Sequence, residues 1–338
     1  MADFLACLRR RVLLLDGAMG TQIQARAPTL KDFGGQENCS EILNLTRPDL
    51  VRDIHAAYLA AGADAVETNS FGGSPLTLAE FGLAERAFEI NRSAALLARE
   101  AVDAVTTPDR PRFVVGSIGP GTKLPSLGHV AYGPLEDALA VQAGGLLAGG
   151  ADTLLIETCQ DPLQIKAAVN GCRRAFAEAG REVPILVQVT IETTGAMLVG
   201  TDIQAAATIV GALEVPLLGL NCATGPREMA EHLRTLRELW PGLISVLPNA
   251  GLPELRDGRT HYPLGAEELA QWLARYVREE GVNLVGGCCG TTPEHIRALD
   301  AMLRDLAEDG FRPRPLDRGK IEPPPALASL FSAVPLRQ

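Results

Sequence analysis

Two adjacent cysteines late in the sequence carry its clearest chemical signal. Cys288 and Cys289 follow a short apolar run, residues 282–285, and the two glycines that end this run. Neighbouring cysteines bridge each other poorly, because a disulfide needs converging side chains and a trans peptide strains that geometry. Two thiolates can turn toward one cation more easily. The pair therefore predicts a metal site, which requires a further sulfur ligand.

Cys222 is the candidate for the third ligand. It stands where another apolar run, residues 217–221, stops. The stretch from Cys222 to Cys288 is too long for a zinc-finger loop. It fits two strand-and-helix units of a barrel, whose strand ends converge on one mouth. The sequence thus predicts three thiols at the ends of two strands.

A site of three thiolates favours zinc, because sulfur is a soft ligand that magnesium and calcium do not prefer. Three ligands leave one tetrahedral position open for water or substrate, which is typical of a catalytic zinc site. Hydrolytic zinc sites generally use histidine and carboxylate ligands to make hydroxide. None of the histidines belongs to a paired motif at a strand end, so hydrolysis is disfavoured. The five are His55, His129, His232, His261 and His295.

Alkyl transfer to sulfur suits such a site better. Three anionic sulfurs weaken the metal as an acid toward water, yet the metal still deprotonates a bound thiol. The resulting thiolate is nucleophilic near neutral pH, where a free thiol with a pKa of about 8.5 is mostly protonated. We therefore predict that Cys222, Cys288 and Cys289 are catalytic residues that bind zinc and activate a substrate thiol.

The rest of the substrate needs polar partners. Asp16 and Glu157 each follow an apolar run, and either carboxylate is suited to hold an ammonium group. The backbone N–H groups from Gly17 to Thr21 are suited to a carboxylate, and Asn221, at another strand end, completes the predicted substrate-binding set. Together these groups fit a thiol amino acid. The alternative is that the two carboxylates only accept backbone N–H groups in their own loops.

Eight predicted strands, separated by helices, must position these residues. Strands that are apolar throughout and alternate with helices indicate a parallel sheet covered on both faces. Eight of them predict a (β/α)8 TIM barrel, with the zinc site at the C-terminal face of the strands. A doubly wound open sheet is the alternative, but no Gly-x-Gly-x-x-Gly follows the first strand. The expected strands are residues 11–16, 64–68, 113–117, 152–157, 185–190, 217–221, 243–247 and 282–285.

The chemically unusual residues fall at the exits of these strands, the face that carries the active site of a barrel. They are Asp16, Glu67, Ser117, Glu157, Thr190, Asn221, Cys222, Asn249, Cys288 and Cys289. Glu67 is as readily structural as functional, so we assign it no role. The expected helices are residues 49–61, about 76–104, 135–148, 163–179, 202–213, 226–239, 265–279 and 293–308.

Composition disfavours several classes of function. With 338 residues and 46% hydrophobic side chains, the chain can bury a large core as one domain. A formal net charge of −10 disfavours nucleic acid, whose phosphates need clustered Lys and Arg. No apolar run reaches the roughly 20 residues that span a bilayer, and the N-terminal residues do not read as a signal peptide. Seven irregularly spaced cysteines indicate a reducing compartment. We therefore expect a cytoplasmic protein that binds neither nucleic acid nor membranes.

The last residues differ in character from the rest. Residues 312–338 include the proline-rich runs Arg312-Pro-Arg-Pro and Glu322-Pro-Pro-Pro325, which leave no room for a useful helix. We expect a barrel domain at 1–311 and a Pro-rich linker at 312–338 that leads toward a missing following domain. The alternative is that this tail packs along the barrel.

Seven segments carry a resemblance to a known family. They are Asp16-Gly-Ala-Met-Gly-Thr, Glu67-Thr-Asn-Ser-Phe, Gly116-Ser-Ile-Gly-Pro, Glu157-Thr, Gly219-Leu-Asn-Cys-Ala, Pro248-Asn-Ala-Gly-Leu-Pro and Gly286-Gly-Cys-Cys-Gly-Thr-Thr-Pro-Glu-His-Ile. In this order they resemble the homocysteine S-methyltransferase family over about residues 10–308. The Gly-Gly-Cys-Cys-Gly and Asn-Cys motifs together are highly specific.

The resemblance implies a substrate and a ligand set. It implies zinc on the three cysteines, with the sulfur of homocysteine as fourth ligand, and it places Glu157 and Asp16 near the amino group of homocysteine. It also suggests that Asn249 approaches the metal when substrate is absent. As a residue shortly before Gly251, Asn249 is equally suited to a turn.

The likeness is strongest to the homocysteine-binding module of multidomain, cobalamin-dependent members of the family. In those enzymes separate modules bind folate and cobalamin, and methylcobalamin donates the methyl group that makes methionine. This sequence has neither module: at Asp53-Ile-His55, its near-match to the cobalamin-ligand motif Asp-x-His-x-x-Gly, Tyr58 replaces the glycine. Methylcobalamin is therefore expected as an external carrier, bound by a separate module.

Two other functions stay open on these residues. A stand-alone homocysteine S-methyltransferase would take its methyl group from S-methylmethionine or S-adenosylmethionine. A non-catalytic barrel stabilised by zinc would bind a thiol ligand or a partner protein without turnover.

Overall fold

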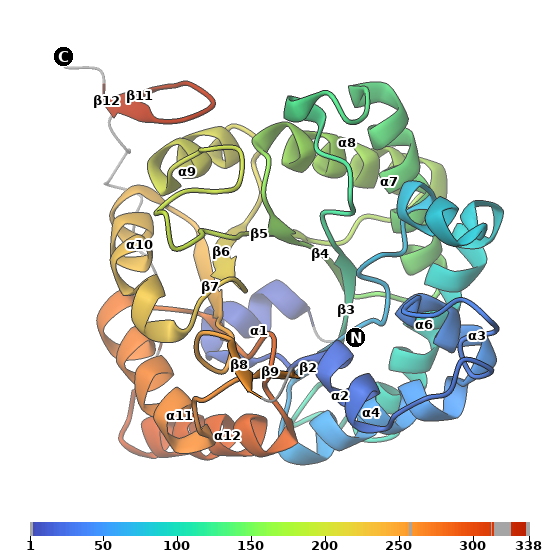
Figure 1. Cartoon of the computed structure of the whole chain (residues 1–338). Coiled ribbons are helices and arrows are strands. Elements are labelled where there is room, and N and C mark those ends of the chain that lie inside the picture. The colour runs from blue at the N-terminus through green and yellow to red at the C-terminus, as the bar shows by residue number, and fades with distance from the viewer. Residues whose placement is uncertain (1–2, 257–258, 312, 314–325, 336–338) are drawn as a thin grey trace.

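The structure is a computed structural model, and it describes residues 3–256, 259–311, 313 and 326–335. Eight parallel strands curl into a barrel with helices around its outside (Figure 1). The strand order is β1-β10-β7-β6-β5-β4-β3-β2, which follows the chain around the ring. The predicted (β/α)8 barrel is confirmed. The strands are β1 (Leu13–Leu14), β2 (Ala65–Glu67), β3 (Phe113–Ile118), β4 (Thr153–Cys159), β5 (Ile185–Val189), β6 (Leu217–Asn221), β7 (Leu243–Leu247) and β10 (Leu284–Val285).

The barrel closes between β1 and β2 through side chains as well as backbone. Asp64 donates its N–H to the carbonyl of Leu14 at 2.7 Å, and its carboxylate accepts the N–H of Leu14 at 3.1 Å. Closer to the mouth, the N–H of Glu67 donates to both carboxylate oxygens of Asp16, at 3.1 and 3.2 Å. The two carboxylates satisfy buried N–H groups that would otherwise lack partners. Asp16 and Asp64 are thus part of the barrel wall.

Helix α1 (Phe4–Arg10) closes the N-terminal end of the barrel, behind the ring of strands in Figure 1. Phe4 and Leu8 are buried and pack with inward-facing strand residues such as Leu13 and Phe113. The rings of Phe4 and Phe113 meet edge to face, with centroids 5.2 Å apart. This end of the barrel is a packed core, which leaves the opposite face for a site.

The other helices cover the outside of the barrel. Five of them, α4, α5, α8, α10 and α12, have proline in the first turn, where a missing N–H costs no hydrogen bond. Besides α1, the α-helices of the described residues are α2 (Met19–Ala25), α3 (Leu43–Thr46), α4 (Pro48–Ala61), α5 (Pro75–Leu78), α6 (Ala87–Asp103), α7 (Tyr132–Ala148), α8 (Pro162–Ala179), α9 (Ile203–Gly211), α10 (Pro226–Leu239), α11 (Ala266–Arg275) and α12 (Pro293–Glu308).

The helix predicted over 76–104 is in fact two helices, α5 and α6. Gly82 lies between them with a φ of +68°, a left-handed conformation that ends a helical segment. Leu78, Ala87 and Ile90 nevertheless belong to one hydrophobic cluster. The apolar pattern therefore runs across the break, because both helices bury residues in the same core.

Two short hairpins add to the barrel. β8 (Glu254–Arg256) pairs with β9 (Arg259–His261) between β7 and α11. β11 (Ala326–Ala328) pairs with β12 (Ala333–Pro335) within the segment expected to be a linker. This second hairpin lies against α9, where the N–H of Asp202 donates to the carbonyl of Phe331 at 2.8 Å. Apart from Pro313 and residues 326–335, the segment 312–338 lies outside the described residues.

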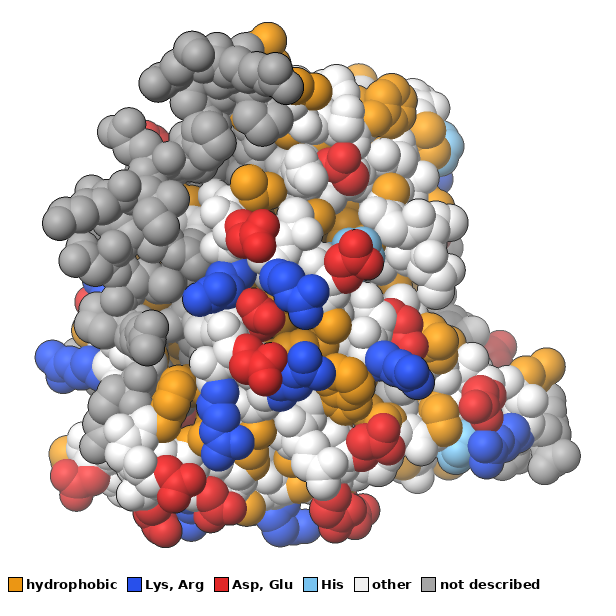
Figure 2. Space-filling view, turned by 90° about the vertical axis from the view of Figure 1, so that its left-hand side faces the viewer, with side chains coloured by type: hydrophobic (Ala, Val, Ile, Leu, Met, Phe, Trp, Pro, Cys, Tyr) orange, Lys and Arg blue, Asp and Glu red, His pale blue; other side chains and the backbone are white. Residues whose placement is uncertain are grey.

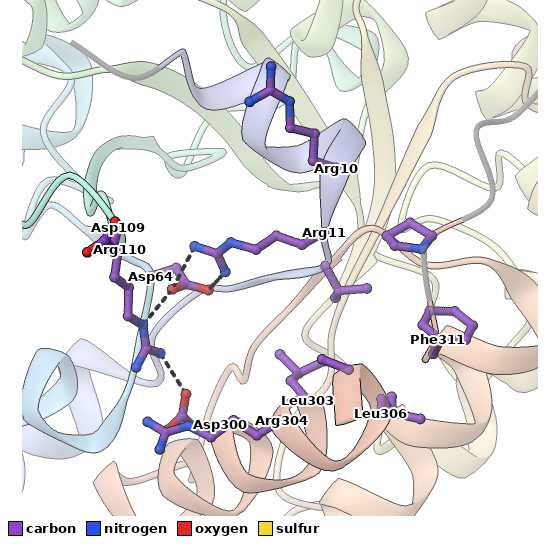
Figure 3. Close-up of a pocket in the computed structure, with 13 residues that line it drawn as sticks. Arg10, Arg11, Asp64, Asp109, Arg110, Asp300, Leu303, Arg304, Leu306 and Phe311 are labelled. Carbon is purple, nitrogen blue, oxygen red and sulfur yellow. Dashed lines mark hydrogen bonds and ion pairs between the residues drawn. The ribbon is translucent and has the colours of Figure 1, made fainter. Parts of the chain in front are cut away.

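A cavity of about 460 Å³ lies at the N-terminal end of the barrel (Figure 3). Asp64 binds Arg11 at 2.6 Å and Arg110 at 3.4 Å, while Asp300 binds Arg110 at 2.6 Å and Arg304 at 2.7 Å. Asp64 precedes β2 and Asp300 lies on α12, so these ion pairs join helix α12 to the barrel wall. We assign this cluster to stability.

The surface carries both signs of charge. Figure 2 shows basic and acidic side chains interspersed on the side where α10 and α11 lie. Pairs such as Arg275 and Glu279, 2.8 Å apart, are exposed and contribute little to stability. Within the described ranges, no helix has the length and apolar character needed to cross a bilayer.

The buried His55 on α4 leads to a prediction about acid stability. Neither of its ring nitrogens has a hydrogen-bond partner among the described residues. Burial lowers its pKa from 6.5 to about 4, because the core disfavours the charged ring. Between these two values the unfolded chain binds a proton that the folded chain does not, so stability falls as the pH falls. When the pH is lowered from 7 to 5, this residue should reduce the free energy of unfolding by about 2 kcal/mol.

Replacing His55 by leucine should remove this part of the pH dependence, as measured by urea unfolding at both pH values. At pH 7 the variant should be as stable as the parent or more so, because an unpartnered polar group leaves the core. An equal loss of stability on acidification in His55→Leu and in the parent would contradict the assignment.

Candidate active site

Three cysteine sulfurs meet at the mouth of the barrel. Cys222 follows β6, whereas Cys288 and Cys289 follow β10. Their Sγ atoms all lie within 4.8 Å of one another, and those of Cys222 and Cys289 are 3.9 Å apart. The structure thus brings together the three predicted sulfurs, although β7 separates β6 from β10 in the sheet.

The loop after β7 holds the two cysteine loops in register. The N–H of Cys222 donates to the carbonyl of Leu247 at 3.1 Å, and the N–H of Cys288 donates to that of Pro248 at 2.8 Å. Cys222 has a φ of +59°, a left-handed conformation that costs a non-glycine residue on the order of 1 kcal/mol or more. Such strain persists only where the surrounding structure enforces it, as at functional sites.

Gly287 lets the side chain of Thr291 pack directly against the second cysteine loop. A Cβ at this position would lie 2.4 Å from Cγ2 of Thr291. The hydroxyl of Thr291 accepts the N–H of Ala18 at 3.1 Å and donates to the carbonyl of Cys288 at 2.6 Å. The glycine before the cysteines therefore allows one threonine to join their loop to the loop after β1.

The three sulfurs strongly affect one another's protonation. Hydrogen bonds from Cys222 and Cys288 lower the pKa of Cys289 to about 3. For Cys222 the hydrogen bond with Cys288 lowers the pKa, but the bond with Cys289 and burial outweigh it and raise the pKa to about 12. Hydrogen bonds with Cys222 and Cys289 raise the pKa of Cys288. One thiolate is thus stabilised by two thiols, and a cation that replaces their protons would meet three anionic sulfurs.

The geometry of this trio fits a tetrahedral zinc ion. With Zn–S bonds of about 2.3 Å, sulfurs at tetrahedral positions lie about 3.8 Å apart, close to the 3.9 Å between Cys222 and Cys289. In the part of the chain that the structure describes, this is the one group of His, Cys, Asp and Glu side chains whose ligand atoms converge in this way. Sulfur is also the soft donor that zinc accepts. The residues present therefore fit a metal ion with one position left for substrate.

A cavity of about 270 Å³ adjoins the sulfurs and has the size of a small-ligand site. The predicted substrate-binding residues that line it are Gly17, Thr21, Glu157 and Asn221. Asp16 is not among its lining residues, because its carboxylate faces the backbone of Glu67 in the barrel wall. Glu67, to which the sequence analysis assigned no role, does line the cavity.

Glu157, near the end of β4, is held by neighbouring strands. Oγ of Ser117 donates to its Oε1 at 2.5 Å, and Nδ2 of Asn221 donates to its Oε2 at 3.3 Å. Asn221 is itself oriented, because its Oδ1 accepts the N–H of Thr158 at 3.0 Å. Burial raises the pKa of Glu157 to about 7, although the bond from Ser117 opposes this. A cation in the cavity would favour its charged form.

Two further carboxyl groups lie close to Glu157. Burial, followed by the charges of Glu157 and Asp16, raises the pKa of Glu67. Burial also raises the pKa of Asp16, with a smaller contribution from Glu157. No Lys or Arg is among the described residues that line the cavity. The site therefore gathers acidic groups without a basic partner, and a ligand with a positive charge would complement it.

Asn249 lies in the loop after β7 and is not among the cavity-lining residues. Its N–H donates to the carbonyl of Thr224 at 3.1 Å. Its side chain is buried, and its Oδ1 has no hydrogen-bond partner within the described ranges. An unpartnered oxygen is what an approach to a metal would need, and that role stays a prediction.

The sequence analysis missed Tyr58, which joins two loops of the site from beneath. This buried side chain lies on α4, and its hydroxyl is 3.1 Å from the carbonyl of Ala18 and 3.2 Å from that of Thr291. Nothing in the pattern of an amphipathic helix signals such a role, because helix packing decides which loops the hydroxyl reaches. Glu41, another missed residue of the cavity wall, accepts the N–H of Gly72 at 2.6 Å.

The fold is thus a (β/α)8 barrel whose C-terminal mouth combines three converging cysteine sulfurs with an acidic cavity, and this is the face on which barrel enzymes carry their active sites. The family model for homocysteine S-methyltransferase matches residues 13–303. The chain belongs to the homocysteine S-methyltransferase family, which makes it a methyltransferase domain.

Two curated relatives are methionine synthases, from Mycobacterium leprae and Mycobacterium tuberculosis. Each is 50% identical over 336 residues, which cover 99% of this chain. The chain spans only 28% of the length of either relative. The similarity therefore concerns one part of each of these longer proteins.

Solved structures of the homocysteine methyltransferase MmuM from Escherichia coli share the fold. Its metallated form is 25% identical with a TM-score of 0.71, over 88% of this chain and 98% of MmuM. Its oxidised form is 26% identical with a TM-score of 0.68, over 86% of this chain and 95% of MmuM.

Proposed function

We propose that this chain binds homocysteine, activates its sulfur as a thiolate at zinc, and accepts a methyl group there to give methionine. In this proposal it is the homocysteine module of a cobalamin-dependent methionine synthase. The observation that carries the proposal is the convergence of Cys222, Cys288 and Cys289 beside a cavity that also contains Glu157. The relatives named methionine synthase support it.

Zinc would be held by the three cysteines, and when bound it supplies the positive charge that lowers the pKa of a thiol at the open position. The chain's own residues bind the rest of the substrate. The carboxylate of Glu157, oriented by Ser117 and Asn221, accepts the substrate's ammonium group. The backbone N–H groups between Gly17 and Thr21, which line the cavity, are proposed to receive its carboxylate.

The methyl group is proposed to come from methylcobalamin bound by a separate module. Support comes from the length of the mycobacterial relatives, of which this chain spans 28%. Cobalamin and folate modules would be the partners in such a longer protein. Residues 1–311 would form the homocysteine-binding domain, and residues 312–338 the connection to the next module.

A cytoplasmic location is part of the same proposal. All seven cysteines are free thiols in the structure. Free thiols persist in a reducing compartment, and the proposed site needs three of them as metal ligands.

Methyl transfer from defined donors tests the proposal. The zinc-loaded chain is mixed with homocysteine and with methylcobalamin, S-methylmethionine or S-adenosylmethionine, and methionine is measured. We expect methionine with methylcobalamin, and none after zinc is removed with a chelator. Turnover with a sulfonium donor instead would favour a stand-alone methyltransferase. Tight homocysteine binding with no turnover from any donor would favour a non-catalytic thiol-binding barrel.

A further inference from the structure

We propose that Glu67 is a second carboxylate that binds the ammonium group of the substrate, and that it makes the site selective for amino-acid thiols over thiols without an amino group. The inference rests on the proposed function and deepens it. It concerns a residue at the end of β2, two strands away from Glu157 on β4.

The carboxylate of Glu67 belongs to a cavity-lining residue and accepts no hydrogen bond from the described residues. Glu67 lines the cavity that adjoins the cysteines, and its side chain is only partly covered there. Within the described part of the chain, neither of its oxygens accepts a hydrogen bond, and Oε1 is completely buried. A carboxylate that lacks every partner is unusual in a folded protein, because burial without hydrogen bonds is costly.

The other two carboxylates nearby are already engaged. Both oxygens of Asp16 face the N–H of Glu67, and Asp16 does not line the cavity. Both oxygens of Glu157 accept side-chain hydrogen bonds, from Ser117 and Asn221. An ammonium group has three N–H donors and no acceptor. Glu67 supplies unused acceptor oxygens, and Asp16 fixes its backbone.

Charge points the same way. No Lys or Arg is among the described residues that line the cavity, so the wall they form offers Glu67 no cation. A substrate ammonium would place one positive charge between carboxylates that otherwise repel one another. A thiol without an amino group would leave Glu67 buried and unpartnered. The unpaired carboxylate would then lower the affinity for that ligand. A polar site rejects an analogue that lacks the matching group in this way.

The test compares two ligands that differ only in the amino group. Homocysteine and 4-mercaptobutanoate, its analogue without the amino group, are titrated calorimetrically into the zinc-loaded full chain and its Glu67→Gln variant. We expect the variant to bind homocysteine about 10- to 100-fold more weakly. It should bind 4-mercaptobutanoate as well as the parent does, or better. Its zinc content should be unchanged, and without substrate it should melt at a higher temperature.

Several outcomes would overturn the inference. Equal weakening of both ligands in Glu67→Gln would show that the residue only supports the cavity. Unchanged homocysteine binding in Glu67→Gln, together with a large loss in Glu157→Gln, would leave the proposed function intact and remove Glu67 from it. Failure of the parent chain itself to bind homocysteine would instead overturn the proposed function.

Glu280 offers a matched control. It is a buried glutamate, but it lies at the opposite end of β10 from the cysteines, near Arg234 and Arg237. Glu280→Gln should not alter the ratio of the two affinities. An equal change of this ratio in the control would also count against a specific role for Glu67.

Discussion

Replacing Cys222 by serine should abolish stoichiometric zinc binding and, with it, homocysteine activation. A serine hydroxyl stays protonated near neutral pH and is not a soft ligand, so the site would keep two sulfurs of three. Changes to residues that only support metal ligands already cost about 10- to 100-fold in affinity. We therefore expect loss of a ligand itself to cost well over about 100-fold. Zinc content after dialysis and a competition titration with a chelator measure it.

Cys7→Ser is the control for this variant. Cys7 is a free, half-buried thiol on α1, at the closed end of the barrel. The Cys7→Ser variant should keep one zinc per chain and full homocysteine binding. A Cys222→Ser protein that retains stoichiometric zinc would remove the central assignment. A far-ultraviolet circular dichroism spectrum and melting curve like those of the parent protein would show that zinc loss does not reflect misfolding.

Replacing Glu157 by glutamine should weaken homocysteine binding by about 10- to 100-fold, because a charge-assisted bond to ammonium becomes a neutral one. The amide fits the same place. Its oxygen can accept from Nδ2 of Asn221, and its NH2 group can donate to Oγ of Ser117. The zinc content should not change. Calorimetric titration with homocysteine measures the effect.

The pH dependence of binding gives this variant a second signature. The pKa of Glu157 is raised to about 7 by burial, so its carboxylate forms as the pH rises through neutrality. Homocysteine binding to the parent should therefore strengthen from pH 6 to pH 8. In Glu157→Gln that part of the increase should disappear, and an identical pH profile in both proteins would argue against direct contact with the ammonium group.

The free energy of unfolding should change with pH in the opposite direction to homocysteine binding. A raised pKa means that the folded chain holds a proton on Glu157 that the unfolded chain releases above about pH 4.5. Stability is therefore lost as the pH rises from 4.5 through 7. Glu157→Gln avoids this loss and should be more stable than the substrate-free parent at pH 8, by on the order of 1–3 kcal/mol. Urea unfolding tests this.

The barrel and its sulfur-rich mouth could be predicted from local patterns. Apolar runs that alternate with amphipathic helices specify a parallel barrel, because strands buried on both faces must be covered by helices. Parallel strands end on one edge, so the cysteines after residues 217–221 and 282–285 had to lie on the same face. Their convergence in space therefore followed from their positions in the sequence.

The roles of the carboxyl groups could not be predicted in the same way. Asp16 and Glu67 both stand at strand exits, and nothing in their motifs shows that one faces backbone while the other faces the cavity. The register between β1 and β2 decides this, since it brings the N–H of Glu67 to the carboxylate of Asp16. Tyr58 likewise reaches Ala18 and Thr291 only through the packing of α4.

The sequence by itself thus determined the fold, the face of the site and the three sulfurs, because each depends on periodicity and on positions relative to strand ends. Only the tertiary structure decided which of these acids lines the cavity and which is held in the barrel wall. That depends on hydrogen bonds between residues far apart in the chain, such as the bond that Ser117 donates to Glu157, and no local pattern encodes such partners.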